Sequence, residues 1–302
     1  MNKIFITGAS GLLSLNTIIK YNKKYDFTAS LNKRDIKLDN YNVNLIKIDL
    51  FNKNLVINYL SKLKPDYIFH NVALTDLELC EKNKSLCFKI NVDLTSVIVD
   101  VCLELGIKLI FISSDQIYSG LKPEYNENSN TDPINYYGIS KIKAEEYIQN
   151  KLKNFLIIRT NFFAWGPSYR SSFSDRVLLS KSKKIFELSD VYFNPVYFKT
   201  LTECIFKLLN KKISGIFNIS SDQNYSKFEL AKLLLNYFNI KREVTPIFLN
   251  EIKSILNRPK IMILSNNKLK TTLGIRSIDM EFCLSSLKSD FENGHFKIIK
   301  SI

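Results

Sequence analysis

The sequence has little of what several classes of protein require. None of its apolar runs approaches the roughly 18–20 residues that cross a bilayer, so no membrane insertion is expected. The 302 residues include five cysteines, an odd number without the paired spacing of a metal site. The two histidines, His70 and His295, lie far apart in the chain. We therefore predict no metal site, and we expect reduced thiols.

The amino-terminal segment MNKIFITGAS lacks the apolar core and the small-residue cleavage site of a signal peptide. No internal repeat or low-complexity linker is present. A composition of 45% hydrophobic and 24% charged residues is ordinary for a globular protein and excludes disorder. Together with the reduced thiols, this predicts a cytoplasmic protein.

Positive charge is abundant, with a formal net charge of +14 and a pI near 9.4. The lysines are spread along the whole chain, and no basic block with interleaved aromatic residues occurs. We therefore expect a solvated lysine-rich surface and no nucleic-acid partner. A general attraction for anionic small molecules is compatible with this charge.

The first half of the chain alternates between short β-branched or aromatic runs and longer segments of helical spacing. Near-continuous apolar strands indicate burial on both faces, and strand–helix alternation favours a doubly wound parallel α/β sheet. The expected strands are 3–7, 26–30, 44–50, 66–72, 108–114 and 154–160, and the expected helices include 12–21, 54–63 and 85–105.

A glycine-containing turn, TGASGLLS at 7–14, follows the first expected strand. Gly8 and Gly11 let the backbone turn tightly and approach a pyrophosphate, which then sits at the positive N-terminus of the next helix. Ser14 takes the third small position and still allows close packing between helix and strand. This placement predicts a dinucleotide site.

Beyond about residue 165 the alternation weakens and helical segments such as 226–238 dominate. We therefore predict a Rossmann-like dinucleotide-binding domain at 1–165, whose sheet some later strands can rejoin. A smaller, mostly helical substrate-binding lobe is predicted at 166–302.

The stretch NYYGISKIKAEEYIQNKL, 135–152, is predicted to be a helix. Residues four apart are neighbours on a helix, so Tyr137 and Lys141 lie side by side and Tyr136 points elsewhere. The rest of that face is apolar, and burying an unpaired ammonium there is costly. The presence of Lys141 on this face therefore suggests a function. We expect the charge of Lys141 to lower the pKa of Tyr137, so that the phenol exchanges a proton with a hydroxyl or ketone.

Two serines end the strand expected at 108–114, at the carboxyl edge where open α/β sheets bind ligands. A hydroxyl there can hold the substrate oxygen that Tyr137 protonates. Because side chains alternate along a strand, we expect only one of Ser113 and Ser114 to face the site.

With these motifs in this order, the chain resembles an extended short-chain dehydrogenase/reductase, and within that superfamily the dTDP-4-dehydrorhamnose reductase group. The resemblance runs nearly end to end. It is carried by TGASGLL, NVALTDLELCE (71–81), KINVDLT (89–95), ISSDQIYSG (112–120), DPINYYGISKIKAEEY (132–147), RTNFFAWG (159–166), FNPVYFKTLTECI (193–205), GIFNISSDQNYSKFELA (215–231) and NRPKIMILSNNKLKTTLGI (257–275).

The resemblance implies roles for individual positions. Ser114 stands at the catalytic Ser/Thr position, Tyr137 is the acid, and Lys141 holds both the tyrosine and the nicotinamide ribose. Other positions implied or expected near the cofactor are Gly8, Ser10, Gly11, Leu12, Asn32, Lys33, Arg34, Asp49, Leu50, Asn71 and Ala73, and those near the substrate are Thr75, Phe162 and Arg258.

The loop SLNKRD, 30–35, bears on the choice of cofactor. Dehydrogenases that prefer NAD usually place an acidic residue there to bind the ribose 2′-hydroxyl. Here Asn32 is followed by Lys33 and Arg34, and two cations suit a 2′-phosphate. We predict a preference for NADP(H), and the use of NAD(H) stays open.

The reaction predicted from the resemblance is the NAD(P)H-dependent reduction of a nucleotide-linked 4-keto-6-deoxy sugar, serving surface-polysaccharide synthesis. A nucleotide-diphosphate sugar needs cations near the cleft, for which Arg258 in its Arg-Pro motif is the candidate. The segment RTNFFAWG departs from the group's Arg-Thr-Ser-Trp form, with Phe162 in place of the tryptophan and Trp165 three residues later. Because of this departure, the identity of the sugar stays open. Whether the protein forms a homodimer also stays open.

Sister activities share the Tyr–Lys pair. Sugar-nucleotide 4,6-dehydratases carry an Asp-Glu pair where this chain has Asp115 and Gln116, and a neutral amide cannot act as that acid/base. Dehydration is therefore disfavoured. Two alternatives stay open. One is an epimerase that retains NAD, and the other is a non-catalytic, cofactor-binding regulatory subunit like those of methionine adenosyltransferase.

Overall fold

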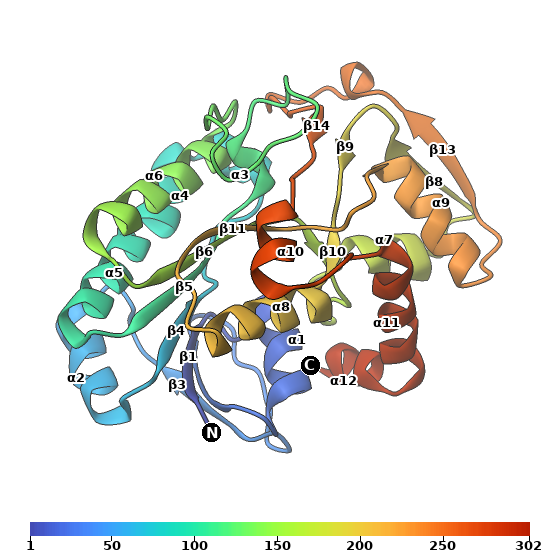
Figure 1. Cartoon of the computed structure of the whole chain (residues 1–302). Coiled ribbons are helices and arrows are strands. Elements are labelled where there is room, and N and C mark those ends of the chain that lie inside the picture. Colours follow the sequence, from blue (N-terminus) through green and yellow to red (C-terminus); the bar gives the residue numbers. More distant parts are fainter.

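The computed structural model describes all 302 residues and is built on a seven-stranded parallel sheet (Figure 1). The strand order is β11-β6-β5-β4-β1-β2-β3, so the order reverses between β1 and β4, where open sheets bind ligands. The doubly wound α/β fold predicted from the sequence is thus confirmed. The strands are β1 Lys3–Thr7, β2 Asp26–Leu31, β3 Val43–Lys47, β4 Tyr67–His70, β5 Lys108–Ile112, β6 Phe155–Thr160 and β11 Gly215–Ile219.

Apolar side chains on both faces of the strands bury the sheet between two helical layers. On one face Phe5, Ile68 and Phe111 pack with α2, α5 and α6, and on the other Ile4 and Ile6 pack with α1 and α8. The helices of this part are α1 Leu12–Tyr21, α2 Lys53–Leu63, α3 Leu77–Lys82, α4 Lys84–Phe88, α5 Leu94–Leu105, α6 Tyr136–Lys151 and α8 Phe198–Asn210. This is the arrangement expected for parallel strands that are apolar on both sides.

Three strands end earlier than predicted. The last residue of β3 to pair with β2 is Lys47, opposite Leu31 at the end of β2, so the segment up to residue 50 has no ladder partner. Similarly β4 ends at His70 and β5 at Ile112. The expected helix 85–105 is α4 and α5 joined by a π-helical turn at Lys89–Asp93.

The second lobe lies on the right of Figure 1, at the carboxyl ends of the strands, and its last two helices lie at the lower right, the final one next to α1. Besides helices it contains small sheets, namely β7 with β10, β8 with β13, and β9 with β12 and β14. Its elements are β7 Phe162–Phe163, α7 Phe173–Leu179, β8 Lys184–Leu188, β9 Tyr192–Phe193, β10 Val196–Tyr197, β12 Tyr225–Ser226, α9 Lys227–Tyr237, β13 Glu243–Ile247, β14 Ile261–Met262, α10 Asn267–Leu273, α11 Met280–Glu292 and α12 His295–Ser301. Because β11 belongs to the main sheet, the chain returns to that sheet after α8. The domain boundary at residue 165 stays a prediction.

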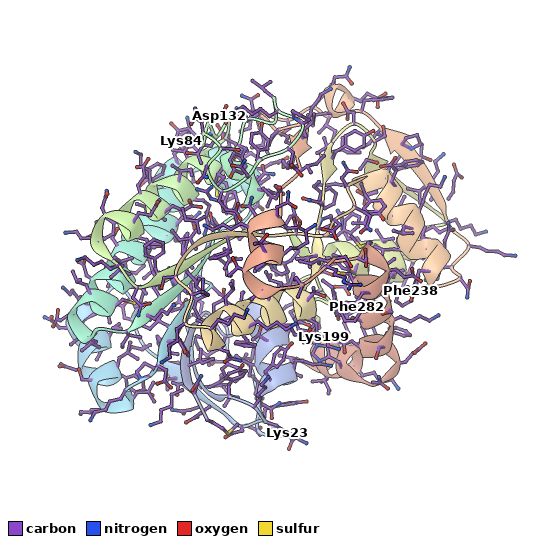
Figure 2. The ribbon with its side chains drawn as sticks, in the orientation of Figure 1. Lys23, Lys84, Asp132, Lys199, Phe238 and Phe282 are labelled. Carbon is purple, nitrogen blue, oxygen red and sulfur yellow. The ribbon has the colours of Figure 1, made fainter.

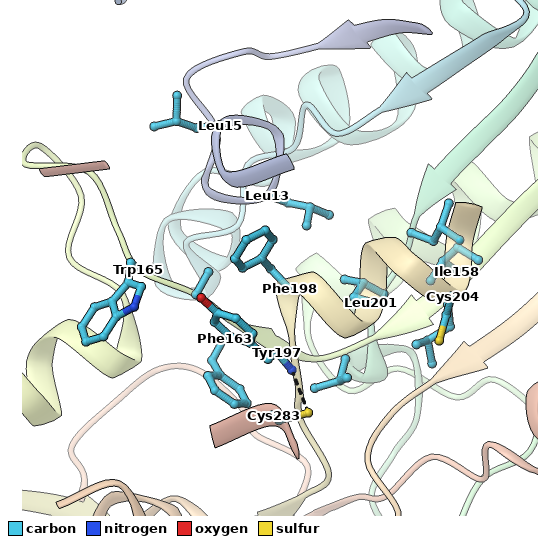
Figure 3. Close-up of a cluster of buried hydrophobic side chains, with 14 of the residues drawn as sticks. Leu13, Leu15, Ile158, Phe163, Trp165, Tyr197, Phe198, Leu201, Cys204 and Cys283 are labelled. Carbon is cyan, nitrogen blue, oxygen red and sulfur yellow. Dashed lines mark hydrogen bonds between the residues drawn. The ribbon is translucent and has the colours of Figure 1, made fainter. Parts of the chain in front are cut away.

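One continuous hydrophobic core joins the two parts (Figure 3). Leu13 of α1, Phe198 of α8 and Trp165 belong to it. Trp165 is fully buried, packs edge-on against Phe296 and donates from Nε1 to the Leu287 carbonyl at 3.1 Å. It therefore serves packing and does not reach the cleft described below.

The surface carries many of the lysines. Exposed examples such as Lys23 and Lys84 project from the edge of the molecule (Figure 2). None of the helices combines the length and the apolar character that spanning a membrane requires. All five cysteines are free and buried.

Candidate active site

A cleft of about 740 Å³ lies at the carboxyl edge of the sheet and extends to the second lobe. Most of the residues singled out from the sequence line it. These are Gly8, Ser10, Gly11, Leu12, Asn32, Lys33, Arg34, Asn71, Ala73, Thr75, Ser114, Tyr137, Lys141, Phe162 and Arg258. Asp49 and Leu50 instead line a smaller cavity of about 360 Å³, which shares Gly8 and Asn32 with the cleft.

The turn after β1 needs its glycine. Gly8 has φ of +75°, and a Cβ there would lie 2.8 Å from Cγ2 of Val72, closer than side chains pack. Its N–H donates to Oγ of Ser30 at 3.0 Å, which ties the turn to β2. A side chain at this position would both strain the backbone and fill the space over β4.

The N-terminus of α1 opens into the cleft with its amide groups uncapped. Gly11 is the N-cap and supplies no side-chain hydrogen bond, and the first turn contains no acidic residue. Asn71 donates from Nδ2 to Oγ of Ser14 at 3.0 Å, while its Oδ1 is buried without a partner. Free donors at a helix N-terminus suit an anionic diphosphate, and a free acceptor suits a hydroxyl. The residues present therefore fit a dinucleotide.

The first turn of α6 sets the register of the tyrosine pair. Asn135 caps the helix by accepting from the N–H of Gly138 at 2.9 Å. Tyr137 and Lys141 then both line the cleft and are buried. Tyr136 lies outside the cleft, with the ammonium of Lys84 3.9 Å from its ring centroid.

The charge states at this pair differ from the prediction. Burial lowers the pKa of Lys141 to about 7, and its Nζ lies 3.9 Å from the ring centroid of Phe111 instead of in an ion pair. Burial also raises the pKa of Tyr137 above its ordinary value, although the nearby Ser114 hydroxyl acts in the opposite direction. The expectation of a lowered pKa for Tyr137 is therefore wrong, because burial of the phenol raises it.

Both serines after β5 line the cleft, but only Ser114 hydrogen-bonds with Tyr137, and the expectation that one serine faces the reacting atoms stays a prediction. The backbone stays extended beyond Ile112, since the N–H of Ser113 donates to the Ile158 carbonyl at 2.7 Å and Ser114 has φ of −147°. Ser114 accepts from the N–H of Gln116 at 3.2 Å and donates to Asp115 at 3.1 Å. Oγ of Ser113 is buried without a partner.

Asp115 is the second titratable group beside the tyrosine. Its Oδ2 accepts from Nδ2 of Asn161 at 2.8 Å. Burial raises its pKa to about 6, although the hydrogen bonds from Asn161 and Ser114 act in the opposite direction. Gln116 accepts from Asn135 at 3.1 Å, so it helps to position the helix cap.

Close approach of α6 to this turn depends on Gly138. A Cβ at Gly138 would collide with the carbonyl oxygen of Gln116 and lie 2.8 Å from Cβ of Pro133. The absence of a side chain is what brings Tyr137 next to Ser114. Sequence reasoning passed over this glycine because its contact is made only in the folded chain.

On the substrate side of the cleft, two cations lack a close carboxylate partner. The guanidinium of Arg258 is 3.9 Å from the carboxylate of Glu78, and its buried Nε has no hydrogen-bond partner. Lys227 is half-buried at the first position of α9, and its pKa is lowered by burial and by the charge of Arg258. Two such cations beside one cleft suit an anionic ligand.

Sequence reasoning missed Lys227, although a signal existed. Ser226 and Glu229 form a capping box that marks the start of α9, and a lysine in a first helical turn opposes the helix dipole. Tyr169 and Arg170 were also missed. They line the cleft from the loop between β7 and α7, whose position depends on packing between distant segments.

Comparison with known proteins identifies the family of the chain. A family model described as the RmlD substrate binding domain matches residues 1–290. The chain is 25% identical over 281 residues to the spore coat polysaccharide biosynthesis protein SpsK of Bacillus subtilis (strain 168), covering 91% of this chain and 93% of SpsK. It is 22% identical over 306 residues to dTDP-4-dehydrorhamnose reductase of Aggregatibacter actinomycetemcomitans, covering 96% and 99%.

Among solved structures, dTDP-4-dehydrorhamnose reductase from Bacillus anthracis in complex with NADP superposes with a TM-score of 0.81. That chain is 25% identical, and the match covers 96% of this chain and 100% of the other. The resemblance predicted from the motifs is confirmed. The chain belongs to the RmlD substrate binding domain family, and its relatives include dTDP-4-dehydrorhamnose reductases, which are extended short-chain dehydrogenases/reductases.

Proposed function

We propose that the protein is an NADPH-dependent reductase of a nucleotide-linked 4-keto-6-deoxy sugar and serves polysaccharide synthesis. The observation that carries this proposal is one cleft containing Ser114, Tyr137 and Lys141 together with the uncapped N-terminus of α1. The similarity to a reductase solved with NADP and to a spore coat polysaccharide protein supports it.

The chain's own groups handle the proton. NADPH, when bound, supplies the hydride for the keto carbon. Tyr137, whose raised pKa keeps the phenol protonated near neutral pH, donates its proton to the keto oxygen, and Ser114 holds that oxygen. The ammonium of Lys141 then stabilises the phenolate that Tyr137 becomes. The buried position of the pair excludes water from this transfer.

The cofactor is proposed to lie along the edge of β1, β2 and β4. Gly8, Ser10, Gly11 and Leu12 surround the diphosphate at the start of α1. Asn71 and Ala73 lie near a ribose, Asp49 and Leu50 near the adenine, and Asn32, Lys33 and Arg34 near the 2′-phosphate. Preference for NADPH over NADH follows from the two cations in this last group.

The substrate is proposed to lie between the catalytic residues and the second lobe. Arg258 and Lys227 are proposed to bind the nucleotide-sugar diphosphate, because both line the cleft and the buried Nε of Arg258 has no hydrogen-bond partner. Thr75 and Phe162 are proposed to contact the remainder of the substrate. The aromatic ring of Phe162 offers an apolar surface for a deoxy sugar.

The proposal is tested by incubating the enzyme with a panel of nucleotide-linked keto sugars and following nicotinamide absorbance. We expect one mole of NADPH to be consumed for each mole of 4-keto-6-deoxy sugar reduced. An epimerase would convert sugar without net consumption of cofactor. A regulatory subunit would bind cofactor and reduce none of the panel. Either result would overturn the proposal.

A further inference from the structure

A loop of the second lobe contacts both sides of the cofactor half of the cleft. In residues 166–172, Tyr169 donates from its hydroxyl to the carbonyl of Ser10 in the glycine turn at 2.9 Å. The next residue, Arg170, donates to Oγ1 of Thr75, beyond β4, at 2.9 Å. The loop therefore joins the turn after β1 to the loop after β4.

The base of this loop is fixed by a buried carboxylate. Oδ2 of Asp175 accepts from the N–H groups of Gly166 and Ser172, at 2.9 and 2.8 Å. Its Oδ1 pairs with Nζ of Lys300 in the C-terminal helix at 2.9 Å. Tyr169 is thus presented by a loop whose two ends are held, and its ring position is defined.

The ring of Tyr169 supports Arg34. The centre of the Arg34 guanidinium lies 4.1 Å from the ring centroid, a stacking distance that leaves the edge N–H groups free to donate. Asp35, the carboxylate next to Arg34 in the chain, pairs instead with Lys47 at 2.8 Å. Arg34 therefore presents its charge toward the cleft from a defined surface.

We propose that Tyr169 is a positioning residue that determines selectivity for NADPH over NADH, by stacking Arg34 in place to bind the 2′-phosphate. The inference rests on the proposed function, in which Arg34 binds that phosphate. An arginine held on an aromatic ring loses less conformational freedom on binding than a free one, so the phosphate is bound more tightly. NADH lacks the phosphate and gains nothing from the stack.

The test measures the affinities of the full-length protein for NADPH and for NADH in Tyr169→Leu and Tyr169→Phe. Tyr169→Leu removes the aromatic face and should weaken NADPH binding about three- to tenfold while NADH binding changes by less than about twofold. Tyr169→Phe keeps the face and loses only the bond to Ser10. It should weaken both cofactors by the same factor and leave their ratio unchanged.

A double-variant comparison separates this inference from the proposed cofactor preference. In an Arg34→Ala background, Tyr169→Leu should have no further effect on the NADPH-to-NADH ratio, because no guanidinium remains to be stacked. A wild-type preference that depends on Arg34 but survives Tyr169→Leu would overturn the role of Tyr169 alone. A wild type that binds both cofactors equally, with no effect of Arg34→Ala, would overturn the cofactor preference itself.

Should the leucine variant fail to fold, Tyr169→Met tests the same contact. Methionine keeps an apolar side chain but lacks the planar ring on which Arg34 stacks. A fall in the NADPH-to-NADH ratio supports the stacking role, and an unchanged ratio contradicts it.

Discussion

Lys141 shows how a single residue can be costly to the fold and useful to the reaction. Its ammonium is buried beside Phe111 without a carboxylate, and burial lowers its pKa to about 7. Tyr137 one turn away is held protonated, also by burial. When the phenol gives up its proton, the phenolate becomes the missing partner of the ammonium. The proposed role of Lys141 is therefore to offset part of the cost of forming a buried phenolate.

Replacing the proton donor tests this account. Tyr137→Phe should lower kcat by about 10²–10⁴-fold and leave NADPH affinity nearly unchanged, because only the hydroxyl is lost. Tyr136→Phe is the matched control and should be mild, since Tyr136 lies outside the cleft beneath Lys84. Steady-state kinetics and cofactor titration decide, and an exchange of the two phenotypes would contradict the proposed register.

The two cations on the substrate side of the cleft predict an effect on substrate binding. Arg258→Ala should raise KM for the nucleotide sugar about ten- to a hundredfold, equivalent to about 1.5–3 kcal/mol, with little effect on NADPH affinity. Lys227→Met should act in the same direction, since methionine keeps the apolar stem without the charge. Arg276→Ala, at an exposed arginine outside the cleft, is the control. An unchanged KM in Arg258→Ala or in Lys227→Met would remove that residue from the site.

At the scale of elements, sequence reasoning succeeded where local pattern suffices. The helix at Leu12–Tyr21 and the strand at Lys3–Thr7 have their predicted limits, because one is set by a glycine turn and the other by a continuous apolar run. The end of β3 was predicted wrongly, since Lys47 is last only because its neighbour β2 stops at Leu31. Strand ends depend on a partner that the local sequence does not contain.

The cleft shows the same division. Gly8 was found in its motif after β1, and Tyr137 from its spacing to Lys141 together with the strand-end serines and the family resemblance. Tyr169 was missed because the second lobe brings it to the cleft through packing between segments far apart in the sequence. The pKa of Tyr137 was predicted in the wrong direction, because spacing shows a neighbouring charge but not the loss of solvent.

The close packing of α6 against the turn after β5 predicts the effect of a small change. In an exposed helix Gly→Ala would stabilise by about 1 kcal/mol. Gly138→Ala should instead destabilise by about 1–3 kcal/mol and lower kcat, because its Cβ collides with the carbonyl of Gln116 and displaces Tyr137 from Ser114.

Gly106→Ala is the control for Gly138→Ala. Gly106 has φ of +66° and open space around it, so alanine there costs about 1 kcal/mol through strain alone and should leave kcat unchanged. Denaturant unfolding and turnover measure the two effects. A Gly138→Ala protein as active and stable as the wild type would show that α6 does not need this contact.

At the scale of the whole molecule, the C-terminal helix returns to the first one. His295 of α12 donates from Nε2 to Oδ1 of Asn16 in α1 at 2.9 Å, and Asn16 donates to the carbonyl of Trp165 at 2.9 Å. His295 also stacks on Phe198 of α8. The buried side chain of Asn16 therefore connects α12, at the C-terminal end of the chain, to α1 and to Trp165.

This link predicts how stability depends on pH. Burial lowers the pKa of His295 to about 4, with Lys20 and Lys199 adding to the effect and Asp290 opposing it. The folded state therefore disfavours the charged imidazolium of His295. The buried neutral ring contributes fully to the free energy of unfolding above pH 6.5, and this contribution is lost as the pH falls toward 4. At pH 4.5 the loss should reach about 2–3 kcal/mol.

The measurement is the free energy of unfolding at pH 7 and at pH 4.5 in wild type and in His295→Gln. Glutamine keeps a donor for Asn16 and does not titrate, so the variant should lose less stability over this interval. His70, whose pKa burial lowers to about 3, is present in both proteins and cancels in the difference. Equal losses in the two proteins would contradict the role of His295.

The central claim is that this cleft transfers a hydride from NADPH to a keto sugar. The most direct measurement uses NADPH deuterated at the transferred position with a nucleotide-linked 4-keto-6-deoxy sugar, and locates the label in the product by NMR. We predict deuterium on the sugar's C4, bound once per NADPH consumed, and none in Tyr137→Phe within the same time. A product that forms without deuterium and without net loss of NADPH would contradict the account.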